Sequence, residues 1–301
     1  MAGLVLRAET GSPPPPSPPP PFVAFDVLQL TALVLLMAMM LPALLSQSVT
    51  RMKTWFNLIV ACIIYCISFI LLLGRQSGPE PPFSLCVFQA GLIYAAPATV
   101  SAAGFAFVIE LYLRLSSTLA VLEVSRRQVT ILLFISPLAH LIVFWVAIFT
   151  ALSQPFGPEG SPIVERSEGG LYCHINSNVP TTVTGVTVVL FIALMIAMEL
   201  YTVVYLFRRR SGFKGVRLPT GTFPLPLFIR TVSYTLAGGL GIILVDILMN
   251  SKASSSNSGF VVLDLMAIIP LSVALVFGSQ MDILGVYMFW KKKGPGQIGK
   301  V

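Results

Sequence analysis

The stretch CVFQAGLIYAAPATVSAAGFAFVIELYLR, residues 86–114, decides the fold, because it is long, apolar and lined with small side chains. Cys86 and Arg114 are 28 positions apart, a separation that an α-helix covers in about 42 Å at about 1.5 Å per residue. That length matches a bilayer with its headgroup layers. Between residues 95 and 106, eight of twelve residues are Ala, Ser or Gly, and such side chains let neighbouring helices approach closely in lipid. The stretch therefore predicts a membrane-spanning helix surrounded by other helices.

The composition of the whole chain is that of a membrane protein. Of 301 residues, 55% are hydrophobic and 10% charged, and the mean hydropathy is +0.87. Runs of roughly 20 apolar residues, the length needed to cross the hydrocarbon core, recur along the sequence. They lie near residues 25–46, 54–74, 83–113, 129–152, 181–207, 223–250 and 259–278. We expect an all-α membrane protein with a seven-transmembrane helix bundle over residues 25–278.

The positive charges orient this bundle. The side of the membrane that holds the connections after the first, third and fifth runs and the C-terminal tail carries fifteen of the nineteen Lys and Arg residues. Loops rich in Lys and Arg stay in the cytoplasm. We therefore expect an extracellular N-terminus, a cytoplasmic C-terminus and a location in the plasma membrane. The net charge of +7 reflects this placement and does not indicate nucleic-acid binding.

Two segments lie outside the predicted bundle. Residues 1–24 contain the tract SPPPPSPPPPF, which is typical of an extended, solvated polyproline helix; a stiff extracellular spacer is favoured over a ligand for a proline-reading domain. In residues 279–301, Ser279 and Asp282 are suited to start a short helix with an aromatic side, and three lysines follow it. This pattern predicts a cytoplasmic amphipathic helix that lies flat on the membrane, followed by a basic tail.

The four cysteines fall into two pairs. With the predicted topology, Cys86 and Cys173 both face an oxidising space. A bridge between them would hold the long fourth connection across the mouth of the bundle and contribute about 2–4 kcal/mol; the alternative is two free extracellular thiols. Cys62 and Cys66 lie four residues apart within the second run, and we expect them to pack as small hydrophobic side chains.

Acidic residues at membrane depth are candidates for function. Glu110 and Arg114 are four residues apart and can pair on one helical face. They form either an inner switch or an interfacial pair whose arginine extends to the headgroups. Glu199 lies in the otherwise apolar fifth run. It is either a protonation switch or, the reading we favour, a neutral acid bonded to a hydroxyl such as that of Tyr201 or one on another span.

A second polar group is predicted at the extracellular mouth. Asp246 and Asp264 both fall towards the outer half of their runs, where together they would give the mouth a negative floor. His174 and Gln89 would lie above this floor, and Tyr94 two turns below Cys86. These residues are the candidate ligand-binding set and suit a cationic or hydroxyl-rich ligand. The alternative is that the two acids sit at helix ends and face solvent.

Several classes of protein are disfavoured by the inventory. With two histidines in the chain, a His-based metal or haem site cannot be assembled, and we expect His140 to pack between helices. No phosphate loop, nucleophile elbow or accessible carboxylate pair occurs, so an enzyme is not expected, and no cofactor is implied. No lysine lies within an apolar run, which excludes a retinal Schiff base.

The seven runs, the outside N-terminus and the match of Cys86 with Cys173 resemble a G-protein-coupled receptor. The ending FGSQMDILGVYMFWKKK, residues 277–293, resembles the poorly characterised seven-helix receptor-like proteins of fungi. The resemblance implies an extracellular ligand and a heterotrimeric G protein as partners. The chain departs from the rhodopsin-like pattern at the inner end of the third run, where Glu110 is followed by leucine and Tyr112, and Arg114 comes three positions late.

The resemblance also implies a G-protein docking surface on the cytoplasmic side. Its basic residues would be Arg126, Arg127, Arg208, Arg209 and Arg210. Orientation and attraction to anionic membrane lipid, about 1 kcal/mol per basic residue, explain the same charges without a protein partner. The alternative functions are a small-solute or proton-coupled transporter that uses the intramembrane acids, and a membrane scaffold that does not signal.

Overall fold

The computed structural model describes residues 20–45, 51–76, 78–120, 124–153, 162–167, 170–209, 228–233, 235–236, 238–239 and 257–279. The helices are α1 (Pro20–Leu45), α2 (Lys53–Ile70), α3 (Phe83–Ala120), α4 (Arg126–Ser153), α5 (Asn178–Arg209) and α7 (Asn257–Gly278). Between α5 and α7, the described residues of 228–239 are also helical, and we call them the 228–239 segment. Helix α1 begins at Pro20, ahead of the predicted boundary, because proline fits the first turn of a helix.

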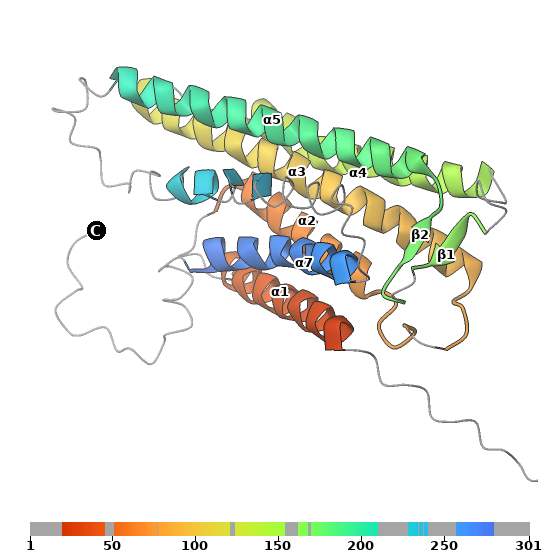
Figure 1. The fold of residues 1–301 in the computed structure, drawn as a ribbon. Helices are drawn as coiled ribbons and strands as arrows, with labels where there is room; N and C mark the ends of the chain where they lie inside the picture. The colour runs from red at the N-terminus through yellow and green to blue at the C-terminus, as the bar shows by residue number, and fades with distance from the viewer. Residues whose placement is uncertain are drawn as a thin grey trace, which may run out of the picture.

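Five of these helices are long and apolar enough to cross a membrane: α1 to α5. They run side by side in Figure 1. The described residues thus form a multi-pass helical membrane protein, which confirms the predicted class. In α7 the described apolar stretch is shorter, Met266–Gly278, and most of the predicted sixth run lies outside the described residues. The predicted amphipathic helix after Ser279 and the proline tract before Pro20 lie outside them as well.

Helix α3 is the packing centre of the bundle. It contacts α2, α4 and α5, and its small residues, among them Ala95, Ala98 and Ala103, are fully buried. At Gly104 an added Cβ would lie 3.1 Å from Met195 Sδ on α5, so the two helices approach closely here. The prediction of a central helix lined with small residues is confirmed.

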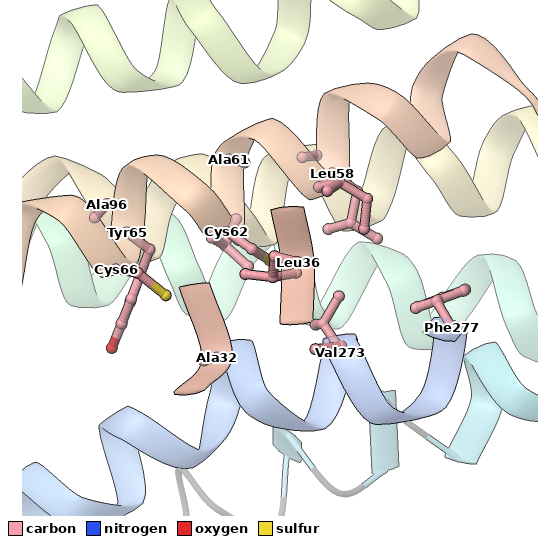
Figure 2. Packing of buried hydrophobic residues seen from close by; sticks show 14 of the residues in the cluster. Ala32, Leu36, Leu58, Ala61, Cys62, Tyr65, Cys66, Ala96, Val273 and Phe277 are labelled. Atoms are coloured by element: carbon pink, nitrogen blue, oxygen red, sulfur yellow. The ribbon is translucent and has the colours of Figure 1, made fainter. Parts of the chain in front are cut away.

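A second packed layer joins the beginning of the chain to α7. Helix α1 contacts both α2 and α7, and the shared core includes Leu36 of α1, Cys62 of α2 and Val273 of α7, all fully buried. Figure 2 shows these side chains meeting between the three helices. Cys62 and Cys66 are free thiols inside this core, as predicted. The layer places α1 beside α7 and turns one face of α2 towards both.

The connection between α4 and α5 contains a small antiparallel sheet. Strand β1 (Val164–Arg166) pairs with β2 (Cys173–Ile175), with Glu165 opposite His174. The prediction of an all-α fold lacked this hairpin, because three-residue strands are too short to give a recognisable alternation. The hairpin lies at the end of the bundle where α3 begins (Figure 1). We call this the hairpin end, and the other the opposite end.

Candidate functional site

A disulfide fixes the hairpin to α3. Cys86, in the first turn of α3, is bonded to Cys173 of β2; the two Cα atoms are 5.2 Å apart and the sequence separation is 87. Both residues are buried. The predicted disulfide is therefore confirmed, and the alternative of two free thiols is wrong.

Gln89 lies one turn further along α3 and is fully buried. Its Nε2 donates to the carbonyl oxygen of Ser68 on α2 at 3.2 Å, and its Oε1 accepts from the backbone N–H of Cys173 at 3.1 Å. One amide thus joins α2, α3 and β2. It was predicted as a ligand contact, and a ligand that used its oxygen would compete with the hairpin backbone.

Tyr94 extends the same attachment. Its hydroxyl donates to the carbonyl oxygen of Ile175 and accepts from the N–H of Ile175, both at 3.4 Å. Its own carbonyl oxygen accepts from Thr184 Oγ1 of α5 at 2.9 Å. Tyr94 therefore connects α3 to both the hairpin and the start of α5, in addition to its predicted role at the ligand site.

His174 faces its strand partner Glu165. The His174 Nε2 and Glu165 Oε1 atoms are 3.4 Å apart, and each side chain is about one-third exposed, at 34%. This contact is an ion pair only when the imidazole is protonated. His174 Nδ1 is buried and has no hydrogen-bond partner among the described residues. Of the predicted ligand-binding residues, His174 therefore keeps a polar group free.

The turn of the hairpin inserts into the bundle core, which the sequence did not predict. Leu171 is 1% exposed and belongs to the core shared by α1, α2, α3 and α7. The ring of Tyr172 packs edge-on against Phe69 of α2, with centroids 6.2 Å apart. Burial, and secondarily the nearby Tyr94, raises the pKa of Tyr172. The signal was the apolar pair LY inside an otherwise polar loop.

A second attachment closes the hairpin onto the connection between α2 and α3. Arg166 Nη1 donates to the carbonyl oxygen of Arg75 at 3.2 Å, and its Nη2 donates to that of Gly78 at 3.0 Å. Gly170 has a φ of +74° and its Cα lies against the backbone of Gln76, where a side chain would clash with the Gln76 carbonyl oxygen. Only glycine fits this turn without strain.

The acids at the hairpin end are only partly described. Asp246 lies outside the described residues, and so does the side chain of Asp264, so the negative floor stays a prediction. Asp26 of α1 is an acid that sequence reasoning did not single out. Its carboxylate oxygens accept from Gln76 Nε2 at 3.0 and 2.9 Å. This bond ties α1 to the same connection that holds the hairpin.

At the opposite end, Glu110 forms a network that joins α3 to α2. It is fully buried. Its Oε1 accepts from Arg114 Nε at 2.8 Å and Nη2 at 2.6 Å, and its Oε2 accepts from Thr54 N–H at 3.2 Å and Thr54 Oγ1 at 2.6 Å. The predicted pair with Arg114 is confirmed. Thr54, which was not predicted as a partner, lies in the first turn of α2, where backbone N–H groups lack partners within the helix and a carboxylate is favourable.

Glu199 is buried on α5, 5% exposed. Its Oε1 lies 2.7 Å from Thr235 Oγ1 in the 228–239 segment. The sequence predicted either the hydroxyl of Tyr201 or a hydroxyl on another helix as the partner of Glu199, and Thr235 is the second kind. The other, Tyr201, is exposed and makes an edge contact with Tyr112 of α3, with ring centroids 5.4 Å apart.

The basic residues predicted for the cytoplasmic face are near the opposite end. Arg126 and Arg127 are exposed in the first turn of α4, and Arg208 is exposed near the end of α5. The side chain of Arg209 and the whole of Arg210 lie outside the described residues. The three described side chains are thus available to an acidic partner or to lipid headgroups.

His140 packs between helices as expected. Its Nδ1 is 2.8 Å from Thr99 Oγ1 of α3, and its ring stacks on Phe144 with centroids 6.0 Å apart. Within the described residues, no cluster of three or more His, Cys, Asp or Glu side chains is placed to hold a metal ion. Comparison with protein-family models and with curated proteins finds no match for the chain.

Proposed function

We propose that the chain is a seven-helix receptor of the G-protein-coupled type, which transmits the binding of an extracellular ligand to a heterotrimeric G protein. The observation that carries the proposal is the double attachment of α3. Its first turn is bonded covalently to the hairpin through Cys86, and its far end holds α2 through Glu110. One packed helix thus connects a surface loop to a buried polar switch.

The proposal includes features that complete the architecture. Two further spans lie near residues 223–250 and 259–278, the hairpin end faces the outside, the C-terminus is cytoplasmic, and the location is the plasma membrane. The apolar sequence of both runs and the excess of Lys and Arg on the opposite side support it. Antibody access to an epitope tag at each terminus in intact cells tests this orientation.

The ligand is proposed to bind at the hairpin end. Asp26, Glu165 and His174 supply polar groups there, and Asp246 and Asp264 are expected to add negative charge. The oxygen of Gln89 already accepts from the hairpin backbone, so a ligand that takes this oxygen must displace β2. Ligand binding and hairpin movement are then one equilibrium, shifted by the ligand's preference for the displaced state.

The switch is proposed to lie at the opposite end. A shift of α3 along its axis would move Glu110 away from Thr54, because these hydrogen bonds are short and directional. Release of α2 would widen the surface between the exposed residues Arg126, Arg127 and Arg208, where an acidic face of a G protein fits. By linkage, a bound G protein must tighten ligand binding by the same factor.

Nucleotide exchange tests this proposal without a known ligand. The full chain is reconstituted in lipid nanodiscs with a purified heterotrimeric G protein, and uptake of a labelled non-hydrolysable GTP analogue is followed. Glu110→Gln keeps the shape but weakens the bonds to Arg114 and Thr54, so we expect basal uptake to rise about fivefold or more, the range of typical coupling energies. Glu80→Gln, an exposed acid in the connection between α2 and α3, is the matched control and should leave basal uptake unchanged. Uptake no higher than in empty nanodiscs for every variant, across G-protein classes, would contradict the receptor.

A proton-coupled transporter is the second candidate, favoured by the buried acid Glu199. Its hydrogen bond to Thr235 reaches a neighbouring helical segment, as a proton-carrying side chain between moving helices would. Vesicles that hold the purified chain and a pH-sensitive dye distinguish the two. Proton flux that depends on Glu199, without any stimulation of nucleotide exchange, would favour the transporter.

A further inference from the structure

The two buried acids of the bundle have opposite hydrogen-bond surroundings. Glu110 accepts four hydrogen bonds, two of them from the Arg114 guanidinium. A carboxylate is the form that accepts at all of these positions. Glu199 is also buried, yet its one hydrogen-bond partner among the described residues is the hydroxyl of Thr235. The ion pairs within the described residues do not include Glu199.

The hydroxyl of Thr235 decides which group carries the hydrogen. Thr235 Oγ1 is 2.7 Å from Glu199 Oε1 and 3.1 Å from the carbonyl oxygen of Thr231, one turn earlier. A hydroxyl has one hydrogen to donate and lone pairs with which to accept. The carbonyl oxygen can only accept, and so can an ionised carboxylate. Both contacts are satisfied together only when Glu199 is protonated and donates to Thr235, which in turn donates to Thr231.

Among the described side chains, only Thr235 forms a hydrogen bond with Glu199. On α5 it shares its buried face with Met195 and Thr202, and the hydroxyl of Thr202 donates to the carbonyl oxygen of Met198 in its own helix. In the 228–239 segment, the described buried residues include Phe228, Thr231 and Thr235, of which Thr235 contacts Glu199. An ionised Glu199 would place an unpaired charge within the membrane, which is strongly unfavourable.

In the part of the chain that the structure describes, the ionisable groups on the neighbouring elements either have other partners or are exposed. Arg230 of the segment donates to the carbonyl oxygen of Val276 on α7. On α3, Arg114 is bonded to Glu110, and the ring of Tyr112 packs on those of Tyr201 and Tyr205. On α4, which also contacts α5, His140 bonds to Thr99, and Arg126 and Arg127 are exposed in its first turn.

We propose that Glu199 is a proton-binding site, and that the bound proton joins α5 to the 228–239 segment. If the two helices separate and admit water, the carboxylic acid releases its proton to the solvent, and Thr235 keeps its bond to Thr231. The separated state then holds one proton fewer. By linkage, a rise in pH therefore favours separation, and a fall in pH favours contact. The site is independent of the receptor proposal, because a receptor and a transporter would hold the proton in the same way.

Infrared spectroscopy of the purified full chain in nanodiscs tests for the proton. A protonated carboxyl in an apolar site gives a C=O stretching band well separated from that of a carboxylate, and the band shifts in D₂O. We expect Glu199→Gln to remove such a band at neutral pH and Thr235→Val to move it to higher frequency, because a hydrogen bond is lost. Glu110→Gln is the matched control and should remove a carboxylate band while leaving the carboxylic-acid band in place.

Distance measurement tests the coupling between proton and helices. Spin labels are placed at Phe207→Cys on α5 and Ile229→Cys in the segment, both exposed positions. The native cysteines are either bonded or buried. We expect the fraction of molecules with separated labels to rise with pH in the otherwise unchanged chain. In the Glu199→Gln background, whose amide cannot ionise, the distance distribution should be the same at every pH.

Each measurement can overturn its part of the proposal. If Glu199→Gln removes a carboxylate band instead, Glu199 is ionised and there is no proton site. If the label distances ignore pH, or if they follow it equally in Glu199→Gln, the proton does not join the helices. Neither result bears on nucleotide exchange, so a failure here leaves the receptor proposal standing, and the reverse also holds.

Discussion

Removal of the Cys86–Cys173 disulfide tests how the hairpin is held. For a loop of 87 residues, the chain-entropy relation gives about 4.6 kcal/mol of stabilisation. That value overstates the effect in a bilayer, where α3 and α4 keep their backbone hydrogen bonds after the bundle comes apart. The chain that gains freedom is then the stretch of 20 residues from the end of α4 to Cys173, and the same relation gives about 3.3 kcal/mol.

The measurement uses the chain's own buried thiols. Cys62 and Cys66 are inaccessible in the folded bundle, so a fluorogenic maleimide reports their exposure during thermal or denaturant-induced unfolding. Cys86→Ser and Cys173→Ser should each cost about 3 kcal/mol, and the double variant should cost about the same 3 kcal/mol. In the single variants the unpaired cysteine is a further reactive thiol, and its signal is subtracted as baseline. A double variant whose cost is the sum of the single costs, about 6 kcal/mol, would show that the two sulfurs stabilise the fold independently and would refute the reasoning.

Three further predictions concern other parts of the bundle. Glu110→Ala should lower the free energy of unfolding by about 3 kcal/mol. This is the lower end of the cost expected when one partner of a buried ion pair is removed, because Arg114 is half exposed. A cost below about 1 kcal/mol would contradict the network. The pKa of Tyr172 is raised above its ordinary value of 10.0. The contribution of Tyr172 to the free energy of unfolding should therefore be complete below pH 10 and decrease as the pH rises above 10. In a series of melting curves at increasing pH, Tyr172→Phe should show less of this decrease. An added methyl at Gly91 would lie 2.9 Å from the Phe144 ring, so Gly91→Ala should cost about 1–3 kcal/mol, whereas Gly185→Ala, with no atom within 4 Å, should not destabilise.

The sequence predicted those features that depend on one helix at a time. The length of an apolar run predicts a membrane-spanning helix, and a run of small residues predicts a helix with close neighbours. The spacing of four residues between Glu110 and Arg114 places their side chains on one helical face. Each of these predictions needs only helical geometry. The disulfide followed from one further assumption, that Cys86 and Cys173 lie on the same side of the membrane. These predictions held in the residues described.

The partners that sequence reasoning missed belong to other elements of the chain. Thr54 is 56 residues from Glu110, and Cys173 is 84 residues from Gln89. Neither pairing has a local pattern, because each depends on how α2, α3 and the hairpin come together. Gln89 could be recognised as a polar residue in an apolar run, which is unusual. Whether Gln89 binds a ligand or stabilises the fold depends on its hydrogen bond with the backbone N–H of Cys173. Cys173 belongs to a loop whose conformation the sequence did not predict.

If the chain is the receptor that we propose, the attachments of the hairpin limit how its ligand can act. Gln89 and Tyr94 both contact the backbone of β2, so they become available to a ligand only when β2 moves. The disulfide lets β2 move only together with the start of α3. A ligand that exploits these side chains therefore also pulls on α3, whose far end holds Thr54 through Glu110. A small molecule that binds His174 and Glu165 alone would leave that linkage untouched, so we expect binding at the exposed face of the hairpin to be silent.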